Sequence, residues 1–314
     1  MRRPIINRTT IHWRWRGALG WLLFLLVSAR VFGQPLSRDE IVAIQLMLDD
    51  AGFSSGRIDG SWGKMSQQAL AAWQQAHDLP ATGEFDSTTT IHFPAQGAIY
   101  TNVSIGGAAT NLTLTIPEDW RERSQLSTMG FTTLVEMLAE RAHASEALIK
   151  ALNPDLAHDS PTVTLPNHAP VKITKASRLR VSLAQKTIAA FDPAGKLIAL
   201  FPCSIAADQE KRPVGQLTVQ TVAFNPDYTF DPANFPELDE QQKSYGKLRI
   251  PPGPNNPVGT AWIGLSRPGY GIHGTPHPEQ IGKTFSHGCF RLANWNAERL
   301  AQMVTSGTPV EVVE

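Results

Sequence analysis

Apolar side chains recur at helical spacing soon after residue 36. Ile41, Ile44 and Leu48 share one helical face. The stretch Ser37–Glu40 in front of them has the form of a capping box, in which the hydroxyl and the carboxylate satisfy free backbone N–H groups. Gly52 is placed to end the helix in a left-handed conformation. The pattern therefore predicts a helix that begins near Ser37 and ends before Gly52.

Two further helices are predicted in the same region. Ala69 and Trp73 belong to a second apolar stripe, and Thr82-Gly83 marks a turn. Ser87 then stands where it would cap a third, short helix. Residues 36–93 are thus expected to form a small all-α domain of three helices.

The next segment begins with a change of composition. Residues 94–127 are rich in Gly, Thr, Asn and Ser, and the alternation over residues 111–116 predicts one strand. Helical spacing resumes at Thr132, and Ser145 is placed to cap a second helix that Asn153-Pro154 ends. A linker and an α-rich middle module are therefore expected up to residue 170.

After Pro170 the period of the apolar positions changes to two, which is typical of strands. The predicted strands begin with the alternation at Leu179, Val181 and Leu183 and continue with Leu197–Ile205, Leu217–Phe224, Ala261–Leu265, Tyr270–His273 and Pro309–Val313. Asn294 is expected to cap the one helix, and the Pro-, Gly- and Asn-rich residues 225–260 read as a long surface loop. This last domain is mainly β.

The start of the chain combines a positively charged segment with a short apolar run. Residues 1–33 hold six arginines and no acidic residue. Five of the arginines precede an apolar run at Ala18–Val27, which small residues follow. This pattern indicates an export signal, and an uncleaved membrane anchor stays open as an alternative. No second apolar run of that length follows, so the rest is expected outside the cytoplasmic membrane, in the periplasm or cell wall.

The overall charge excludes one class of partner. The 314 residues contain 28 basic and 28 acidic side chains, and removing the leader leaves the remainder mildly acidic. No basic excess indicates nucleic acid as a partner, and oligomeric state is left open. The two cysteines, Cys203 and Cys289, allow one bridge at most and exclude a disulfide framework.

Candidate chemistry gathers near the C-terminus. Cys289 follows His273 by sixteen positions. A cysteine thiol can act as a nucleophile, and a histidine imidazole can act as its general acid and base. Gly288 would let a backbone approach closely, so the turn at Ser286–Cys289 is a candidate oxyanion hole. On the residues alone, a buried and inert Cys289 is equally compatible. Cys203, in an apolar stretch, reads as a core residue, with a regulatory bridge to Cys289 left open.

A zinc site is the alternative for the same region. His273, His277, His287 and Cys289 are all possible ligands, but Gly and Pro residues between the first two prevent a helical pair and no C-x₂-C spacing exists. We therefore expect no metal there. His277 and the histidines of the middle module are expected to be exposed loop residues.

The residues around this pair resemble the YkuD-type L,D-transpeptidase domain. The resemblance rests on Tyr270–Thr275 and Ser286–Leu292, and extends over about residues 171–314. Similar runs also stand at Pro213–Gly215, Pro252–Thr260 and Trp262–Gly264. It implies a β-sandwich catalytic domain that acts on peptidoglycan tetrapeptide stems without a cofactor or metal. The family is acylated by carbapenems.

The resemblance also implies roles for single residues. Cys289 would attack the L-centre carbonyl of the third stem residue and form a thioester, His273 would be the acid–base, and the Gly274 carbonyl would orient the imidazole. A neighbouring stem amine would resolve the thioester into a 3→3 cross-link, whereas water would give L,D-carboxypeptidase activity.

Four further residues receive supporting roles in the same way. Ser286, His287 and Gly288 would shape the turn before the nucleophile. Arg291 would dock a substrate carboxylate or brace the loop, with a surface ion pair as the alternative. A non-catalytic wall-binding protein is the rival function, and the retention of His273, Cys289 and Arg291 argues against it.

The front modules carry resemblances of their own. Asp59–Ser66, Trp73-Gln74 and Leu79–Gly83 look like the three-helix peptidoglycan-binding domain, with Ser66 in place of the usual Thr. The two middle helices followed by Val163–Pro166 are similar to a degenerate LysM module, although its opening strand is not recognisable. The predicted division is residues 1–33 for the signal, 36–93 for the peptidoglycan-binding domain, 94–170 for the linker and LysM-like module, and 171–314 for the catalytic domain.

Overall fold

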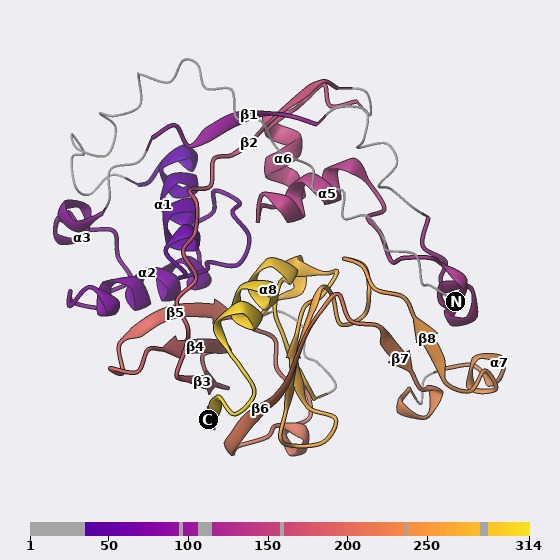
Figure 1. Cartoon of the computed structure of the whole chain (residues 1–314). Helices are drawn as coiled ribbons and strands as arrows, with labels where there is room; N and C mark the ends of the chain where they lie inside the picture. The colour runs from indigo at the N-terminus through magenta and orange to yellow at the C-terminus, as the bar shows by residue number, and fades with distance from the viewer. Residues whose placement is uncertain (1–34, 94–96, 106–114, 158–159, 236–237, 283–287) are drawn as a thin grey trace, which may run out of the picture.

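The computed structural model describes residues 35–93, 97–105, 115–157, 160–235, 238–282 and 288–314 (Figure 1). The predicted signal over residues 1–33 lies outside the described residues, as do Ser286 and His287. Among the described residues, no helix has the length and apolar character needed to cross a membrane.

The N-terminal region is helical, as predicted. Its helices are α1 (Arg38–Asp50), α2 (Lys64–Ala76) and α3 (Ser87–His92). The capping box of α1 is present, with the Ser37 and Glu40 side chains each accepting from the other's backbone N–H, and Gly52 follows at φ +97°. The cap of α3 differs from the prediction by one position. Asp86 accepts from the backbone of Thr89, and Ser87 is the first helical residue.

The middle region contains three helices between two paired strands. They are β1 (Tyr100–Ser104), α4 (Trp120–Gln125), α5 (Leu134–Arg141), α6 (Glu146–Leu152) and β2 (Thr162–Pro166), with β1 antiparallel to β2. Ser145 caps α6 as expected. The strand predicted over residues 111–116 lies largely outside the described residues, while the strand at β1 was not predicted. The likeness to LysM stays a prediction.

The C-terminal domain is mainly β, as predicted. One eight-stranded sheet has the order β11-β10-β9-β6-β12-β3-β4-β5. Its strands are β3 (Arg178–Ser182), β4 (Thr187–Phe191), β5 (Leu197–Pro202), β6 (Gly215–Phe224), β9 (Ala261–Leu265), β10 (Gly271–His273), β11 (Phe290–Arg291) and β12 (Pro309–Val313), and α8 (Asn294–Met303) is its helix. Short 3₁₀ turns occur at Gln209–Lys211, Pro232–Asn234 and Pro278–Gln280.

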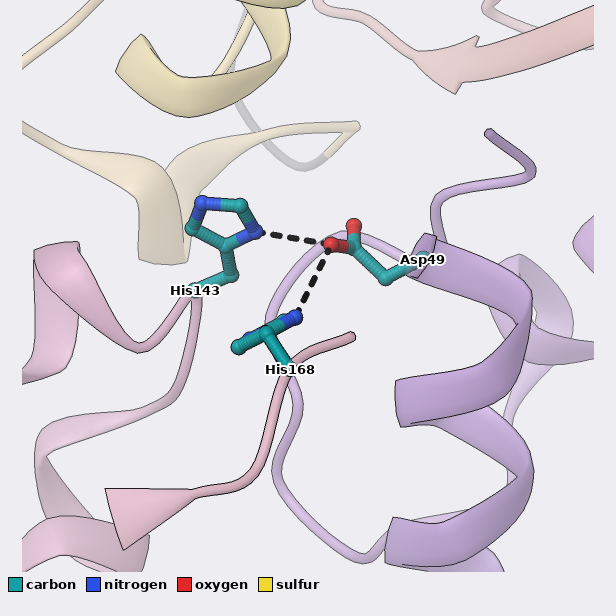
Figure 2. Close-up of side chains that lie close together, drawn as sticks. All are labelled: Asp49, His143 and His168. Atoms are coloured by element: carbon teal, nitrogen blue, oxygen red, sulfur yellow. Dashed lines mark hydrogen bonds and ion pairs between the residues drawn. The ribbon is translucent and has the colours of Figure 1, made fainter. Parts of the chain in front are cut away.

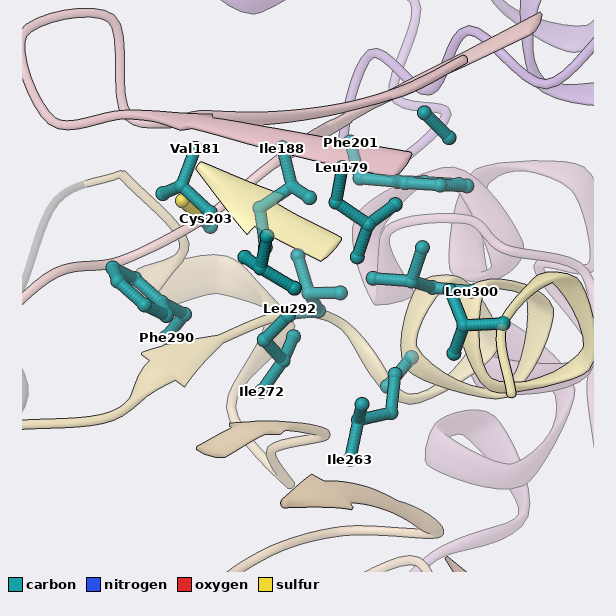
Figure 3. Packing of buried hydrophobic residues seen from close by; sticks show 14 of the residues in the cluster. Leu179, Val181, Ile188, Phe201, Cys203, Ile263, Ile272, Phe290, Leu292 and Leu300 are labelled. Atoms are coloured by element: carbon teal, nitrogen blue, oxygen red, sulfur yellow. The ribbon is translucent and has the colours of Figure 1, made fainter. Parts of the chain in front are cut away.

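The two layers implied by the resemblance are halves of this single curled sheet. Ile188 and Phe201 of one half and Ile272 and Phe290 of the other belong to one buried apolar cluster, which Figure 3 shows. Backbone hydrogen bonds between Ser204 and Arg291, 2.9 and 3.0 Å long, link the chain after β5 to β11. The strands at opposite ends of the sheet order are therefore brought together.

The segment predicted as a long loop has structure of its own. It holds the antiparallel pair β7 (Tyr228–Phe230) and β8 (Leu248–Ile250), with α7 (Glu240–Lys243) between them. We call this segment the hairpin arm. Its apolar side chains pack with α4, where the Trp120 and Phe230 rings stack with centroids 4.2 Å apart. Partners distant in sequence, which local composition does not reveal, therefore stabilise the arm.

The N-terminal helices pack directly on the C-terminal domain. The chain after α1 pairs with edge strand β5, where Leu200 N donates to Gly52 O (3.0 Å) and Leu200 O accepts from Ser54 N (2.9 Å). Leu197 and Leu200 are buried in the apolar cluster of α1 and α2. The two regions therefore share an apolar core.

The middle module docks on α8. Glu136 and Glu140 lie one turn apart on α5, and they accept hydrogen bonds from Asn255 (2.5 Å) and Asn294 (2.6 Å). Asn294 is the first residue of α8 and not its cap, which corrects the prediction. Its side chain is instead used to join two domains.

A buried carboxyl at this junction gives a stability prediction. Burial raises the pKa of Glu140 to about 8, despite the hydrogen bond from Asn294. The folded protein then holds a proton that the unfolded chain releases near pH 4.5, so stability falls as pH rises from there to about 8. Glu140→Gln removes this loss, and its unfolding midpoint should exceed that of the wild type by on the order of 5 °C at pH 8 and match it near pH 4.5. Glu146→Gln, on the exposed side of α6, is the control, and identical pH dependence of Glu140→Gln and wild type would contradict the assignment.

Candidate active site

Two neighbouring parallel strands bring the predicted nucleophile and base together. In β10 and β11, Ile272 pairs with Phe290 and His273 with Arg291. Ile272 and Phe290 point into the core, so the alternation of a strand places His273 and Arg291 on the opposite face. Cys289 lies at the bend immediately before β11. His273 and Cys289, sixteen positions apart in the sequence, thus lie at two adjacent strands of the sheet.

The imidazole of His273 is held in one tautomer. Its Nδ1 lies 2.6 Å from the carbonyl oxygen of Gly274, and a carbonyl only accepts, so Nδ1 carries the proton. Burial lowers the pKa of His273 to about 4, with the charge of Arg291 acting in the same direction. The ring is therefore neutral near pH 7, and Nε2 has a free electron pair to take a proton.

The thiol of Cys289 is partly exposed and also uncharged at rest. Burial raises its pKa, while the backbone of Gly271 and the charge of Arg291 oppose the shift. The sulfur lies 3.6 Å from the carbonyl oxygen of Gly269. A neutral thiol beside a neutral imidazole has to lose its proton as it attacks, which is the task of a general base.

Asn294 fixes the backbone that orients the histidine. A Cβ at Gly274 would collide with Asn294 Oδ1, which also accepts from Thr260 N (3.2 Å). Glycine is thus required at 274 by the close approach of this amide. Gly288 is different, because an added Cβ would meet only the Tyr270 ring at 3.6 Å, an ordinary contact. Its predicted close approach has no counterpart among the described neighbours.

Two aromatic residues near the pair were not assigned a role from sequence. Trp262 pairs with His273 across β9 and β10, and the two rings stack with centroids 5.6 Å apart. Tyr228 of the hairpin arm lies near Cys289, which adds to the effect of burial in raising the pKa of Tyr228. The strand register would have indicated Trp262, whereas the position of the arm has no local signal.

The remaining candidates lie apart from this pair. Cys203 is a free thiol in the core, and burial raises its pKa to about 12, which suits an inert residue. His277 is an exposed loop residue whose Nδ1 lies 3.5 Å from Glu279, as expected. The middle-module histidines His143 and His168 are not the exposed loop residues that the sequence predicts. His143 and His168 bind the carboxylates of Asp49 and Asp50.

Comparison with known families agrees with this geometry. Residues 176–312 match the family described as the L,D-transpeptidase catalytic domain, YkuD. The C-terminal domain belongs to this family. Residues 37–90 match the family described as a putative peptidoglycan binding domain. The resemblances to the YkuD domain and to the peptidoglycan-binding domain are therefore confirmed.

Individual relatives of this L,D-transpeptidase domain cover only parts of the chain. A 61-residue stretch is 46% identical to "Putative L,D-transpeptidase YkuD" of Bacillus licheniformis and covers 19% of this chain and 37% of that protein. Over 153 residues the identity to "Probable L,D-transpeptidase ErfK/SrfK" of Escherichia coli is 28%, covering 48% of this chain and 49% of the other. The chain thus spans less than half of either relative. A solved L,D-transpeptidase structure from Xylanimonas cellulosilytica is 16% identical with a TM-score of 0.37, covering 87% of this chain and 93% of that one.

Proposed function

We propose that this protein is a peptidoglycan L,D-transpeptidase that cross-links stem peptides through a thioester on Cys289. The observation that carries the proposal is the tautomer of His273, whose Nδ1 proton on Gly274 leaves Nε2 as a base on the face of the sheet beside Cys289. The membership of this domain in the YkuD family supports the substrate class.

The first step acylates Cys289. The Cys289 sulfur attacks the carbonyl of the third stem residue while its proton moves to Nε2 of His273. The tetrahedral intermediate then expels D-Ala, whose amine takes that proton. A thioester joins the acyl group to the sulfur, and the backbone N–H groups at Gly288 and Cys289 are the candidate donors to the oxyanion.

The second step transfers the acyl group to an acceptor. A side-chain amine of a neighbouring stem attacks the thioester and loses a proton to His273, and the thiol is released as it regains a proton. The product is a 3→3 cross-link. Water as acceptor would make the protein an L,D-carboxypeptidase, which is the second candidate function and uses the same first step.

The front domain supports the choice of substrate. Residues 37–90 match a peptidoglycan-binding family, and α1 and α2 pack on strand β5 of the catalytic domain. Binding to the wall polymer would therefore hold the catalytic domain close to its stems. An extracytoplasmic location follows from this substrate, in the periplasm or cell wall.

Product analysis distinguishes the two acceptors. The purified protein is incubated with a disaccharide tetrapeptide, and the products are separated and identified by mass spectrometry. The proposal predicts free D-Ala and a dimer whose fragmentation shows a bond between two third-position residues. Release of D-Ala with only tripeptide monomer would identify a carboxypeptidase. Unchanged substrate with folded protein would support the non-catalytic alternative.

Arg291 gives a prediction about substrate docking. Its charge acts on both Cys289 and His273, and burial lowers its own pKa. Arg291→Lys keeps the charge but loses the planar two-pronged geometry, so acylation by tetrapeptide should fall about 10- to 100-fold. Labelling of Cys289 by iodoacetamide should stay near the wild-type rate. Equal acylation rates with tetrapeptide in the two proteins would show that Arg291 does not dock the substrate.

A further inference from the structure

A group of titratable side chains outside the catalytic pair lies where the three regions of the chain meet. Asp49 comes from the end of α1, His143 from the turn between α5 and α6, and His168 from the segment after β2 (Figure 2). One ligand atom from each lies within 4.8 Å of the others. The proposed reaction uses none of the three.

The two imidazoles direct the same ring atom at the same carboxylate. Asp49 Oδ2 lies 2.7 Å from His143 Nδ1 and 3.9 Å from His168 Nδ1. Two ligands of a tetrahedral zinc ion are separated by roughly 3.3 Å, given metal–ligand bonds of about 2.0–2.1 Å. These two separations fall on either side of this value, and all three ligand atoms lie within 4.8 Å of one another, so side-chain movements would bring them into one coordination shell.

Surrounding groups orient both histidines. His168 Nε2 lies 3.0 Å from the carbonyl of Ala142, which can only accept, so the Nε2 proton is fixed and Nδ1 is the ligand atom. The His143 ring stacks on Trp295 of α8, with centroids 5.3 Å apart and planes 7° from parallel. Both rings are therefore preorganised.

The carboxylate shows a second feature that points to a ligand. Asp49 is 2% exposed, and its Oδ1 is buried with no hydrogen-bond partner among the described residues. The neighbouring Asp50 adds a carboxylate, with Oδ1 2.6 Å from His168 Nδ1. Arg299 donates to the backbone carbonyls of both aspartates and not to their carboxylates. The second carboxylate oxygen of Asp50 accepts from the backbone N–H of Ala169 (2.8 Å).

We propose that Asp49, His143 and His168 bind a divalent transition-metal ion of the zinc type, with Asp50 or water as the fourth ligand. Imidazole nitrogen with carboxylate oxygen is a donor set that suits zinc, whereas magnesium and calcium prefer oxygen alone. The ion replaces the protons that now link the imidazoles to the carboxylates. Its role is structural, because it joins α1 to the middle module beside Trp295 and α8.

Binding is tested on the full chain carrying Cys289→Ala, so that the thiol of the catalytic site does not contribute. Titration of the metal-free protein with zinc chloride should show one ion bound per chain. The unfolding midpoint should rise with zinc and return after chelation, because the ion binds only the folded form. Cobalt in place of zinc should give the intense visible absorption of a tetrahedral site.

Substitutions locate the site. Asp49→Asn and His168→Gln should each lower zinc affinity more than 10-fold and abolish the cobalt absorption, whereas His92→Gln, at the exposed end of α3, should change neither. If the first two variants fail to fold, the cobalt spectrum of the parent protein decides. Absence of stoichiometric zinc binding, or unchanged affinity in the folded variants, would show that the cluster is a hydrogen-bonded junction only.

Discussion

Replacing His273 by alanine is expected to slow the acylation of Cys289 by about 10²- to 10⁴-fold. Burial lowers the pKa of His273 and raises that of Cys289, so the resting pair is uncharged and the thiol depends on Nε2 to remove its proton. The variant lacks that base and also lacks a donor for the departing amine. The rate of adduct formation with tetrapeptide or a carbapenem, followed by intact-mass spectrometry, measures the loss.

His277→Ala is the matched control for this experiment. His277 lies four positions further along the chain and is exposed, with Glu279 as its neighbour. The acylation rate of the His277→Ala protein should equal that of the wild type. A His273→Ala protein that acylated at the control rate would exclude His273 as the base and contradict the tautomer argument.

Removal of the front modules is expected to prevent stable folding of the catalytic domain. A protein of residues 171–314 would expose Leu197 and Leu200, now 7% and 9% exposed, and would leave edge strand β5 without its pairing to Gly52 and Ser54. Each leucine contributes about 1.5–3 kcal/mol when buried, against a total stability of about 5–15 kcal/mol. The loss of Met129 and α4 from the hairpin arm adds to this effect.

Thermal unfolding followed by circular dichroism tests this prediction. Residues 35–314, which keep every described module, are the control and should unfold cooperatively. The shorter protein should aggregate or lack a cooperative transition. A cooperative transition near that of the control, with retained acylation, would show that the domains are energetically independent.

Local sequence signals predicted the elements that depend on local interactions. The capping box at Ser37–Glu40 and the cap at Ser145 are present, because a cap is defined by residues three positions apart. Ala261–Leu265 and Pro309–Val313 are strands with the expected bounds. Asp86 was missed because two adjacent polar residues both suit a cap, and only the backbone conformation distinguishes them.

Elements that depend on distant partners were not predicted. The hairpin arm reads as a loop because its apolar residues pack with Trp120 of α4, which lies in another module. Asn294 was read as a cap, but its amide joins Glu140 to the backbone of Thr260. Similarly, His143 and His168 looked like surface residues because Asp49 is about a hundred positions away.

The candidate site also contains residues that the sequence predicted and one that it did not. Cys289, His273 and Gly274 are predicted from motif and resemblance. The structure places His273 on β10 and Cys289 at the bend immediately before the neighbouring strand β11, with the Gly274 contact formed. Their catalytic roles remain proposals. Trp262 was missed because its contact with His273 depends on the pairing of β9 and β10, which no single motif encodes.

The central claim is that Cys289 forms a thioester with the stem peptide, and one measurement tests it most directly. The protein is incubated with a disaccharide tetrapeptide, quenched in acid, and analysed by intact mass and peptide mapping. We predict an adduct with the mass of the substrate less D-Ala on the peptide that contains Cys289, and no adduct in Cys289→Ala. An adduct on Cys203, or product formation that survives in Cys289→Ala, would contradict the account.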